Sequence, residues 1–185
     1  MSQNADRALV LLRHAKSAWP DVPDHERPLA RRGQRDAPLM GRWLRAAGYV
    51  PDLVLCSAAR RARETWELAQ AELGAAPQVR FSDAVYEAAP ADLIGLARET
   101  DSSVRVLLIV GHNPAMEELA LDLAGGEGAA APEAFGRMRA KFPTAAVAVL
   151  EVTGGWAGLS RGNARLARFV TPREIAAGGP PQTSS

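Results

Sequence analysis

Runs of apolar residues alternate along this chain with longer stretches in which apolar side chains recur every three or four positions. Short runs rich in valine, leucine and isoleucine are typical of buried strands, and the longer periodic stretches are typical of helices. The strand runs are Ala8–Leu12, Leu53–Cys56, Val79–Phe81, Val104–Val110, Ala145–Val152 and Leu166–Val170. The fourth and fifth runs are almost continuously apolar, as expected for strands with both faces buried.

Helical spacing of apolar residues covers positions 37–47 and 62–73, and a glycine follows each stretch. Because proline is tolerated at the first helical position, further helices are predicted from Pro90 to Arg98, after Pro114, and from Pro132 to Met138. Strands that alternate with helices predict an α/β fold. We expect a three-layer sandwich, in which helices flank a mostly parallel central sheet of about six strands.

Length and composition indicate one domain. The chain has 185 residues, of which 47% are hydrophobic, and this is enough to bury one sizeable core. We assign residues 1–170 to this domain and predict a flexible C-terminal tail over residues 171–185, where Ala, Gly, Pro and Ser dominate. The polar start is followed by an apolar run too short for a signal peptide or a membrane span, so a cytoplasmic protein is expected.

Basic and polar residues follow three of the predicted strands. Arg13 and His14 follow the first strand, Ser57 and Arg61 follow the second, and His112 lies in a Gly-His-Asn-Pro turn after the fourth. Ligands of such sheets bind just beyond the carboxyl ends of the strands, so these side chains are predicted to meet at one edge. Two histidines placed in this way favour a functional role over a structural one.

The predicted helix after the second strand breaks a local rule. Ser57 is expected to cap its N-terminus. Arg60, Arg61 and Arg63 fall in its first turns, where the helix dipole favours acidic side chains. A bound anion at the helix start would compensate for this arrangement. We therefore interpret Arg61 as an anion ligand, whereas Arg60 and Arg63 are equally well explained as solvent-exposed side chains.

Composition narrows the range of partners. The 22 basic residues nearly balance the 21 acidic residues, giving a formal net charge of +1, and Lys16 and Lys141 are the only lysines. This balance argues against binding to nucleic acid or to a membrane surface.

The single cysteine, Cys56, excludes a disulfide within the chain. A cysteine phosphatase loop places arginine at the sixth position after its nucleophile, and here that position is Ala62. We therefore interpret Cys56 as a buried strand residue.

Three motifs in combination resemble the histidine phosphatase superfamily, whose fold is phosphoglycerate mutase-like. They are Arg-His after the first strand, Ser-x-x-x-Arg-Ala after the second, and Gly-His-Asn after a later strand. The opening Leu-Leu-Arg-His-Ala-Lys-Ser, over Leu11–Ser17, is similar to the SixA-type phosphohistidine phosphatases in particular. Asp24–Leu29 and Val85–Ala88 also resemble that branch, and the resemblance extends from about Leu9 to Val170.

The resemblance implies a metal-independent phosphatase that needs no cofactor and forms a phosphohistidine intermediate on His14. It also implies that Arg13, Arg61 and His112 hold the phosphoryl oxygens. A neutral imidazole is a suitable nucleophile when its second nitrogen keeps its proton. Guanidinium groups suit the charge that spreads over phosphoryl oxygens, and a bound phosphate dianion would raise the pKa of His112 and make it a third cationic donor.

Other polar residues are candidates for supporting roles. Ser17 and Asn113 are expected to add hydrogen bonds to the phosphoryl group. The leaving group needs a proton, and Glu87, which follows the third predicted strand, is the leading candidate for the general acid. Asp21 and Asp24 are weaker candidates, and Glu87 is equally well explained as a surface ion-pair partner.

Three functions remain open on the sequence. The leading hypothesis is a phosphatase whose partner is a phosphorylated protein, carrying phosphohistidine, or a small phosphorylated substrate. A mutase or sugar phosphatase is the second, but Ala15 and Pro20 stand where the wider superfamily usually has glycine and many sugar-phosphate members have asparagine. The third is a non-catalytic phosphate-binding adaptor, against which the intact set of basic residues argues.

Overall fold

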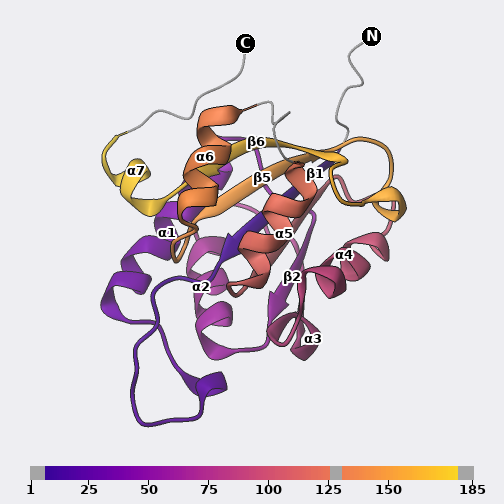
Figure 1. The fold of residues 1–185 in the computed structure, drawn as a ribbon. Helices are drawn as coiled ribbons and strands as arrows, with labels where there is room; N and C mark the ends of the chain where they lie inside the picture. Colours follow the sequence, from indigo (N-terminus) through magenta and orange to yellow (C-terminus); the bar gives the residue numbers. More distant parts are fainter. Residues whose placement is uncertain (1–6, 126–130, 179–185) are drawn as a thin grey trace.

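A computed structural model describes residues 7–125 and 131–178. Its centre is a six-stranded sheet in the order β3-β2-β4-β1-β5-β6 (Figure 1). The strands are β1 (Arg7–Arg13), β2 (Leu53–Ser57), β3 (Gln78–Ser82), β4 (Val106–Gly111), β5 (Val147–Val152) and β6 (Ala164–Val170). Neighbouring strands in the series β3, β2, β4 and β1 pair in parallel. Strand β5 pairs antiparallel with both of its neighbours, β1 and β6. The predicted mostly parallel sheet is therefore confirmed.

Helices cover both faces of the sheet, as the alternating pattern predicted. They are α1 (Arg31–Ala46), α2 (Arg60–Gln70), α3 (Asp83–Tyr86), α4 (Pro90–Arg98), α5 (Ala115–Ala124), α6 (Pro132–Ala140) and α7 (Pro172–Ala176), with short 3-10 helices η1 (Asp24–Glu26) and η2 (Trp156–Gly158). One core packs α1 and α2 on one face, and a second core packs α4, α5 and α6 on the other (Figure 1).

Strand β1 shows how the sequence builds two cores. Side chains of a strand point to alternate faces. Leu9 and Leu11 therefore enter the core under α5, and Val10 and Leu12 enter the core under α1 and α2; all four are fully buried. This double burial is the physical reason for the continuous apolar run in the sequence.

The C-terminal segment is a correction to the sequence analysis. Residues 172–176, predicted to belong to a flexible tail, form helix α7 because Thr171 and Glu174 build a capping box at its start. Helix α7 packs against α1, and Pro172 is buried. The remaining predicted tail, residues 179–185, lies outside the described residues.

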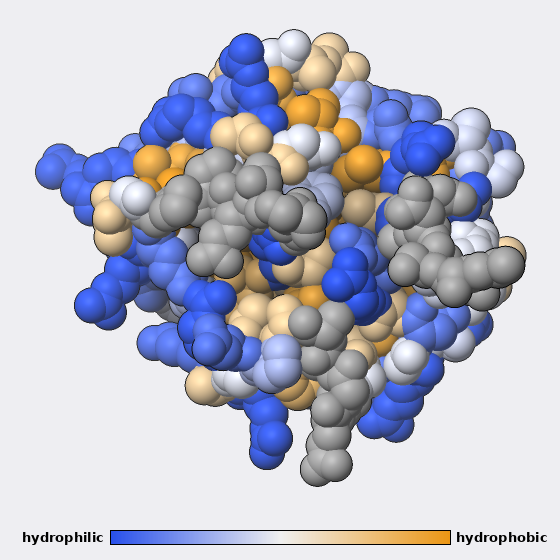
Figure 2. Space-filling model, turned by 90° about the horizontal axis from the view of Figure 1, so that it is seen from above, coloured by the Kyte–Doolittle hydropathy of each residue, from blue (hydrophilic) through white to orange (hydrophobic). Residues whose placement is uncertain are grey.

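The two ends of the sheet differ. A loop between β1 and α1 projects beyond the carboxyl ends of the parallel strands, at the bottom of Figure 1. The opposite side of the molecule is mostly hydrophilic, with apolar side chains in small groups (Figure 2). Within the described ranges, 7–125 and 131–178, no helix is long and apolar enough to cross a membrane.

Candidate active site

Two histidines meet at the carboxyl edge of the sheet, as the sequence predicted. Arg13, the last residue of β1, pairs in register with Gly111, the last residue of β4, so that His14 and His112 leave neighbouring strands side by side. Their ring centroids lie 5.0 Å apart, with the ring planes inclined by 50°. Strand β4 lies between β1 and β2, which places the end of β2 at the same site.

His14 is buried and fixed in one tautomer. Its Nδ1 lies 2.7 Å from the carbonyl oxygen of Ala15, which can only accept, so Nδ1 carries the proton and Nε2 presents its lone pair. The Ala15 N–H donates to Thr65 Oγ1 at 3.0 Å, which anchors this segment to α2. Burial is the main cause that lowers the pKa of His14 to about 3, so the imidazole is neutral at physiological pH. A neutral, oriented imidazole can act as a nucleophile.

His112 bonds to a serine from the neighbouring strand. Its Nε2 lies 2.7 Å from Ser57 Oγ, while its buried Nδ1 has no hydrogen-bond partner among the described residues. Burial, followed by the positive charge of Arg61, lowers the pKa of His112 to about 4. The expectation that Ser57 caps α2 was wrong, because the N-cap is Ala59, whose N–H donates to Ser57 Oγ at 3.2 Å. Ser57 instead holds His112.

Arg13 and Asn113 share a backbone acceptor. Arg13 donates through Nη1 to the Phe142 carbonyl at 2.7 Å, and its buried Nε has no partner within residues 7–125 and 131–178. The Asn113 amide nitrogen donates to Glu117 Oε2 at 2.9 Å and to the same Phe142 carbonyl at 3.3 Å. Both acceptors fix the orientation of this amide, so Asn113 would have to give up one of these bonds to donate to a phosphoryl oxygen. Glu117 was not singled out in the sequence.

Arg61 is buried at the start of α2 and bonds to the loop after β1. Its Nη1 donates to the Asp24 carbonyl at 2.7 Å, and its Nη2 donates to Asp24 Oδ2 at 2.9 Å. Hydrogen bonds from Arg27 and Tyr86 are the leading causes that hold the pKa of Asp24 well below its usual range. A lowered pKa favours the ionised carboxylate, which supplies no proton, so this shift argues against Asp24 as the general acid.

Ser17 and Glu87 lie at the margins of this arrangement. Ser17 is buried, and its hydroxyl oxygen accepts a hydrogen bond from Arg27. Glu87 is exposed directly after α3; its backbone N–H donates to the Asp83 carbonyl, but its side chain makes no hydrogen bond or ion pair with the other described residues. The structure therefore brings Arg13, His14, Arg61 and His112 together and leaves Glu87 outside their hydrogen-bond network.

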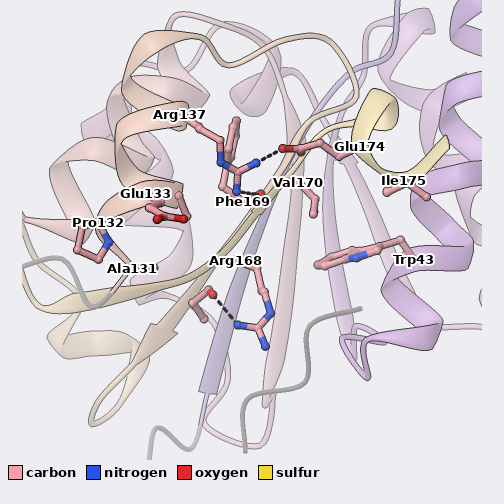
Figure 3. A pocket seen from close by; sticks show the side chains of 12 residues that line it. Trp43, Ala131, Pro132, Glu133, Arg137, Arg168, Phe169, Val170, Glu174 and Ile175 are labelled. Carbon is pink, nitrogen blue, oxygen red and sulfur yellow. Dashed lines mark hydrogen bonds and ion pairs between the residues drawn. The ribbon is translucent and has the colours of Figure 1, made fainter. Parts of the chain in front are cut away.

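A cavity of about 740 Å³ lies elsewhere, between α6, β6 and α7 (Figure 3). Trp43 and Phe169 line it, and Arg137 bonds there to Glu174 and to the Phe169 carbonyl. It contains none of the four residues grouped at the carboxyl edge. The chemistry is therefore assigned to the cluster of histidines and arginines and not to this cavity. Within the described part of the chain, no group of three or more His, Cys, Asp or Glu side chains could hold a metal ion.

The fold and this edge of the sheet define an α/β protein with two histidines and two arginines grouped at the carboxyl ends of its strands. The chain belongs to the histidine phosphatase superfamily (branch 1), because its residues 9–105 match that family model. Within the superfamily it is of the SixA type. A SixA structure from Nakamurella multipartitia is 32% identical, covers 90% of this chain and 96% of its own, and superposes with a TM-score of 0.76. A SixA structure from Agrobacterium tumefaciens is 28% identical over 90% of this chain and 98% of its own, with a TM-score of 0.75.

A mycobacterial relative extends the similarity. Protein Rv1276c of Mycobacterium tuberculosis is 45% identical over 163 residues, which are 88% of this chain and 100% of that protein. The structure of the protein histidine phosphatase SixA complexed with tungstate shares the fold at 22% identity, with a TM-score of 0.71 over 91% of this chain and 99% of its own. The family match and the similarity to the SixA structures from Nakamurella multipartitia and Agrobacterium tumefaciens support phosphatase activity.

Proposed function

We propose that the protein is a metal-independent phosphatase in which His14 forms a phosphohistidine intermediate. In the first step, Nε2 of His14 attacks phosphorus, the bond from phosphorus to the leaving group breaks, and the leaving group takes up a proton. In the second step, water attacks the same phosphorus, the N–P bond breaks, and inorganic phosphate leaves a neutral His14. The observation that carries this proposal is the buried His14 ring, whose Nδ1 bonds to the Ala15 carbonyl and whose Nε2 is left for the attack.

The neighbours of His14 suit the charge of the transition state. Arg13 and Arg61 bring two guanidinium groups to the site, and the His112 ring, whose buried Nδ1 has no partner among the described residues, has its centroid 5.0 Å from that of His14. Charge-assisted hydrogen bonds are each worth about 1.5–3 kcal/mol. In a buried pocket such fixed donors need little reorganisation as charge spreads over the phosphoryl oxygens.

The proton supply bears on the substrate. Hydrogen bonds from Arg27 and Tyr86 lower the pKa of Asp24, and the Glu87 side chain makes no hydrogen bond or ion pair with the described residues of the site. A phosphorylated imidazole leaves easily because its nitrogen is readily protonated, whereas an alkyl ester needs a strong acid. This favours phosphohistidine in proteins as the substrate, followed by small phosphoesters with good leaving groups. Glu87 remains the candidate proton donor for esters, and the similarity to SixA structures supports the preference for phosphohistidine.

The test is the release of phosphate from p-nitrophenyl phosphate and from a phosphohistidine peptide, with EDTA present. Wild type is compared with His14→Ala and with Ser103→Ala, a control at an exposed turn outside the site. Turnover that survives EDTA, vanishes in His14→Ala and persists in Ser103→Ala is expected, with the peptide as the better substrate. A folded wild type without turnover on either substrate would contradict the proposal and favour a phosphate-binding adaptor.

A further inference from the structure

Asp24 is the centre of a hydrogen-bond network that joins three elements. Its Oδ1 accepts from Arg27 Nη1 at 2.8 Å. Its Oδ2 accepts from Arg61 Nη2 at 2.9 Å and from the Tyr86 hydroxyl at 2.8 Å. The donors come from the loop after β1, from α2 and from the end of α3, so one carboxylate ties these elements together.

Arg61 depends on Asp24 for its orientation. The side-chain hydrogen bonds of Arg61 in the described part of the chain both go to Asp24, one to the carboxylate and one to the backbone carbonyl. The Arg61 side chain is 7% exposed and the Asp24 side chain is 51% exposed, so a buried guanidinium bonds to a carboxylate that is about half exposed. A guanidinium presents its donors in a rigid plane, and two fixed acceptors on one side set the direction of the remaining N–H groups.

Tyr86 connects the same network to the histidine pair. Its ring packs edge-on against His112, with centroids 5.5 Å apart, while its hydroxyl donates to Asp24. Arg61 also lies 5.9 Å from the Tyr86 ring centroid. One tyrosine therefore contacts both the carboxylate that holds Arg61 and the ring of His112.

We propose that Asp24 is the positioning residue that aims Arg61 at the phosphoryl group, and that Tyr86 fixes Asp24 in this role. This inference rests on the proposed function, in which Arg61 binds the phosphoryl oxygens. The alternative role of a carboxylate at this place is competition, in which Asp24 occupies Arg61 until an anion displaces it. The two roles predict opposite effects on oxyanion affinity. Loss of a positioning group weakens binding, whereas loss of a competing negative charge strengthens it.

The experiment is a double-mutant cycle of Asp24→Asn and Arg61→Lys, read by the dissociation constant of orthovanadate and by kcat and KM on p-nitrophenyl phosphate. Asp24→Asn is expected to weaken vanadate binding about 10-fold with Arg61 present and less than about 2-fold in the Arg61→Lys background, because groups that act through one another are not additive. The loss of kcat/KM is expected to follow the same pattern and to lie mainly in kcat. Glu26→Gln removes a negative charge two residues after Asp24 in the same loop. It should change neither the vanadate dissociation constant nor kcat/KM.

Tyr86→Phe provides an independent variant without a change of charge. It should weaken vanadate binding about 3-fold in the Arg61 protein and leave it unchanged in the Arg61→Lys background. It decides the question if Asp24→Asn fails to fold, as judged by thermal unfolding. Equal losses in both backgrounds, or tighter vanadate binding by Asp24→Asn, would overturn the proposal. Vanadate binding measured by calorimetry needs no turnover, so failure of the proposed function is distinguishable from failure of this inference.

Discussion

The imidazole rings of His14 and His112 lie 5.0 Å apart, although 98 positions of sequence separate them, because β1 and β4 pair in parallel and end in register. Each ring has one nitrogen committed to a protein group, the Ala15 carbonyl for His14 and Ser57 for His112. The second nitrogen of each ring has no protein partner among the described residues. In the proposed mechanism, the pair supplies the nucleophile and one donor to the phosphoryl group.

The low pKa values of the two histidines predict that the protein loses stability as the pH is lowered within a defined window. Burial lowers the pKa to about 3 for His14 and about 4 for His112, from an ordinary value of 6.5. Between pH 6.5 and these values the unfolded chain binds protons that the folded chain does not, so acidification favours unfolding. Each histidine is expected to cost about 2 kcal/mol of the free energy of unfolding between pH 7 and pH 5.

The measurement is urea unfolding of wild type and His14→Asn at pH 7 and pH 5. The variant should lose less stability than wild type over this interval. The lowered pKa of Asp24 also makes the protein less stable in acid, but only at pH values near and below its ordinary pKa of 3.8. Asp24 therefore does not contribute between pH 7 and pH 5. An identical pH dependence in the two proteins would show that His14 titrates normally in the folded state.

Arg13→Lys should lower kcat/KM on a phosphohistidine peptide by about 10- to 100-fold, because lysine keeps the charge but loses the planar pair of donors. Arg13 donates a hydrogen bond through Nη1 to the Phe142 carbonyl, and its buried Nε has no partner in the described part of the chain. Arg7→Lys is the matched control, since Arg7 begins the same strand at the opposite end of the sheet. Steady-state kinetics of the two variants would disprove the role of Arg13 if both lost activity equally.

Ser57→Ala should reduce kcat/KM about 10-fold while the protein stays folded. The substitution leaves Nε2 of the half-buried His112 without its 2.7 Å partner, and an unpaired buried polar group costs about 1–3 kcal/mol. Ser103→Ala serves as the control, because it removes a hydrogen bond from a serine hydroxyl to Asp101 in an exposed turn. Unchanged kinetics of Ser57→Ala would mean that the position of His112 does not depend on this bond.

Gly33→Ala should destabilise the protein and impair catalysis together. A Cβ at this position in α1 would lie 2.3 Å from the Lys16 carbonyl oxygen, which also accepts the Ala30 N–H. Relief of this overlap must move α1 or the segment directly after His14, at a cost of about 1–3 kcal/mol. Gly136→Ala, in α6 with open space around the new methyl group, should instead be neutral or slightly stabilising. Chemical denaturation and kinetics of both variants check the difference, and a neutral Gly33→Ala would contradict the close approach.

The sheet and the histidine pair could be predicted because their signals are local. Continuous apolar runs mark strands buried on both faces, and residues at the ends of parallel strands meet at one edge whatever the details of packing. The network of Asp24, Arg61 and Tyr86 could not be predicted in the same way, because its members come from three elements whose relative placement is set by tertiary packing.

Helix α7 was missed for a different reason. The surrounding Ala, Gly, Pro and Ser residues suggested a tail, while the Thr171–Glu174 capping box that starts the helix is a signal of only two residues. Likewise, Glu87 follows the third strand in sequence, but α3 comes between them and ends at Tyr86, so Tyr86 and not Glu87 bonds into the network.

The place of β4 in the middle of the sheet has a consequence for synthesis on the ribosome. Strands β1 and β2 emerge first, yet they never pair with each other, since β4 separates them. A nascent chain that ends before residue 111 therefore holds His14 and Arg61 without the strand that brings them together. The pocket assembles only through contacts between distant parts of the chain, which form slowly compared with local ones. Phosphoryl chemistry should thus appear abruptly, and only after β4 has left the ribosome and inserted between its two older neighbours.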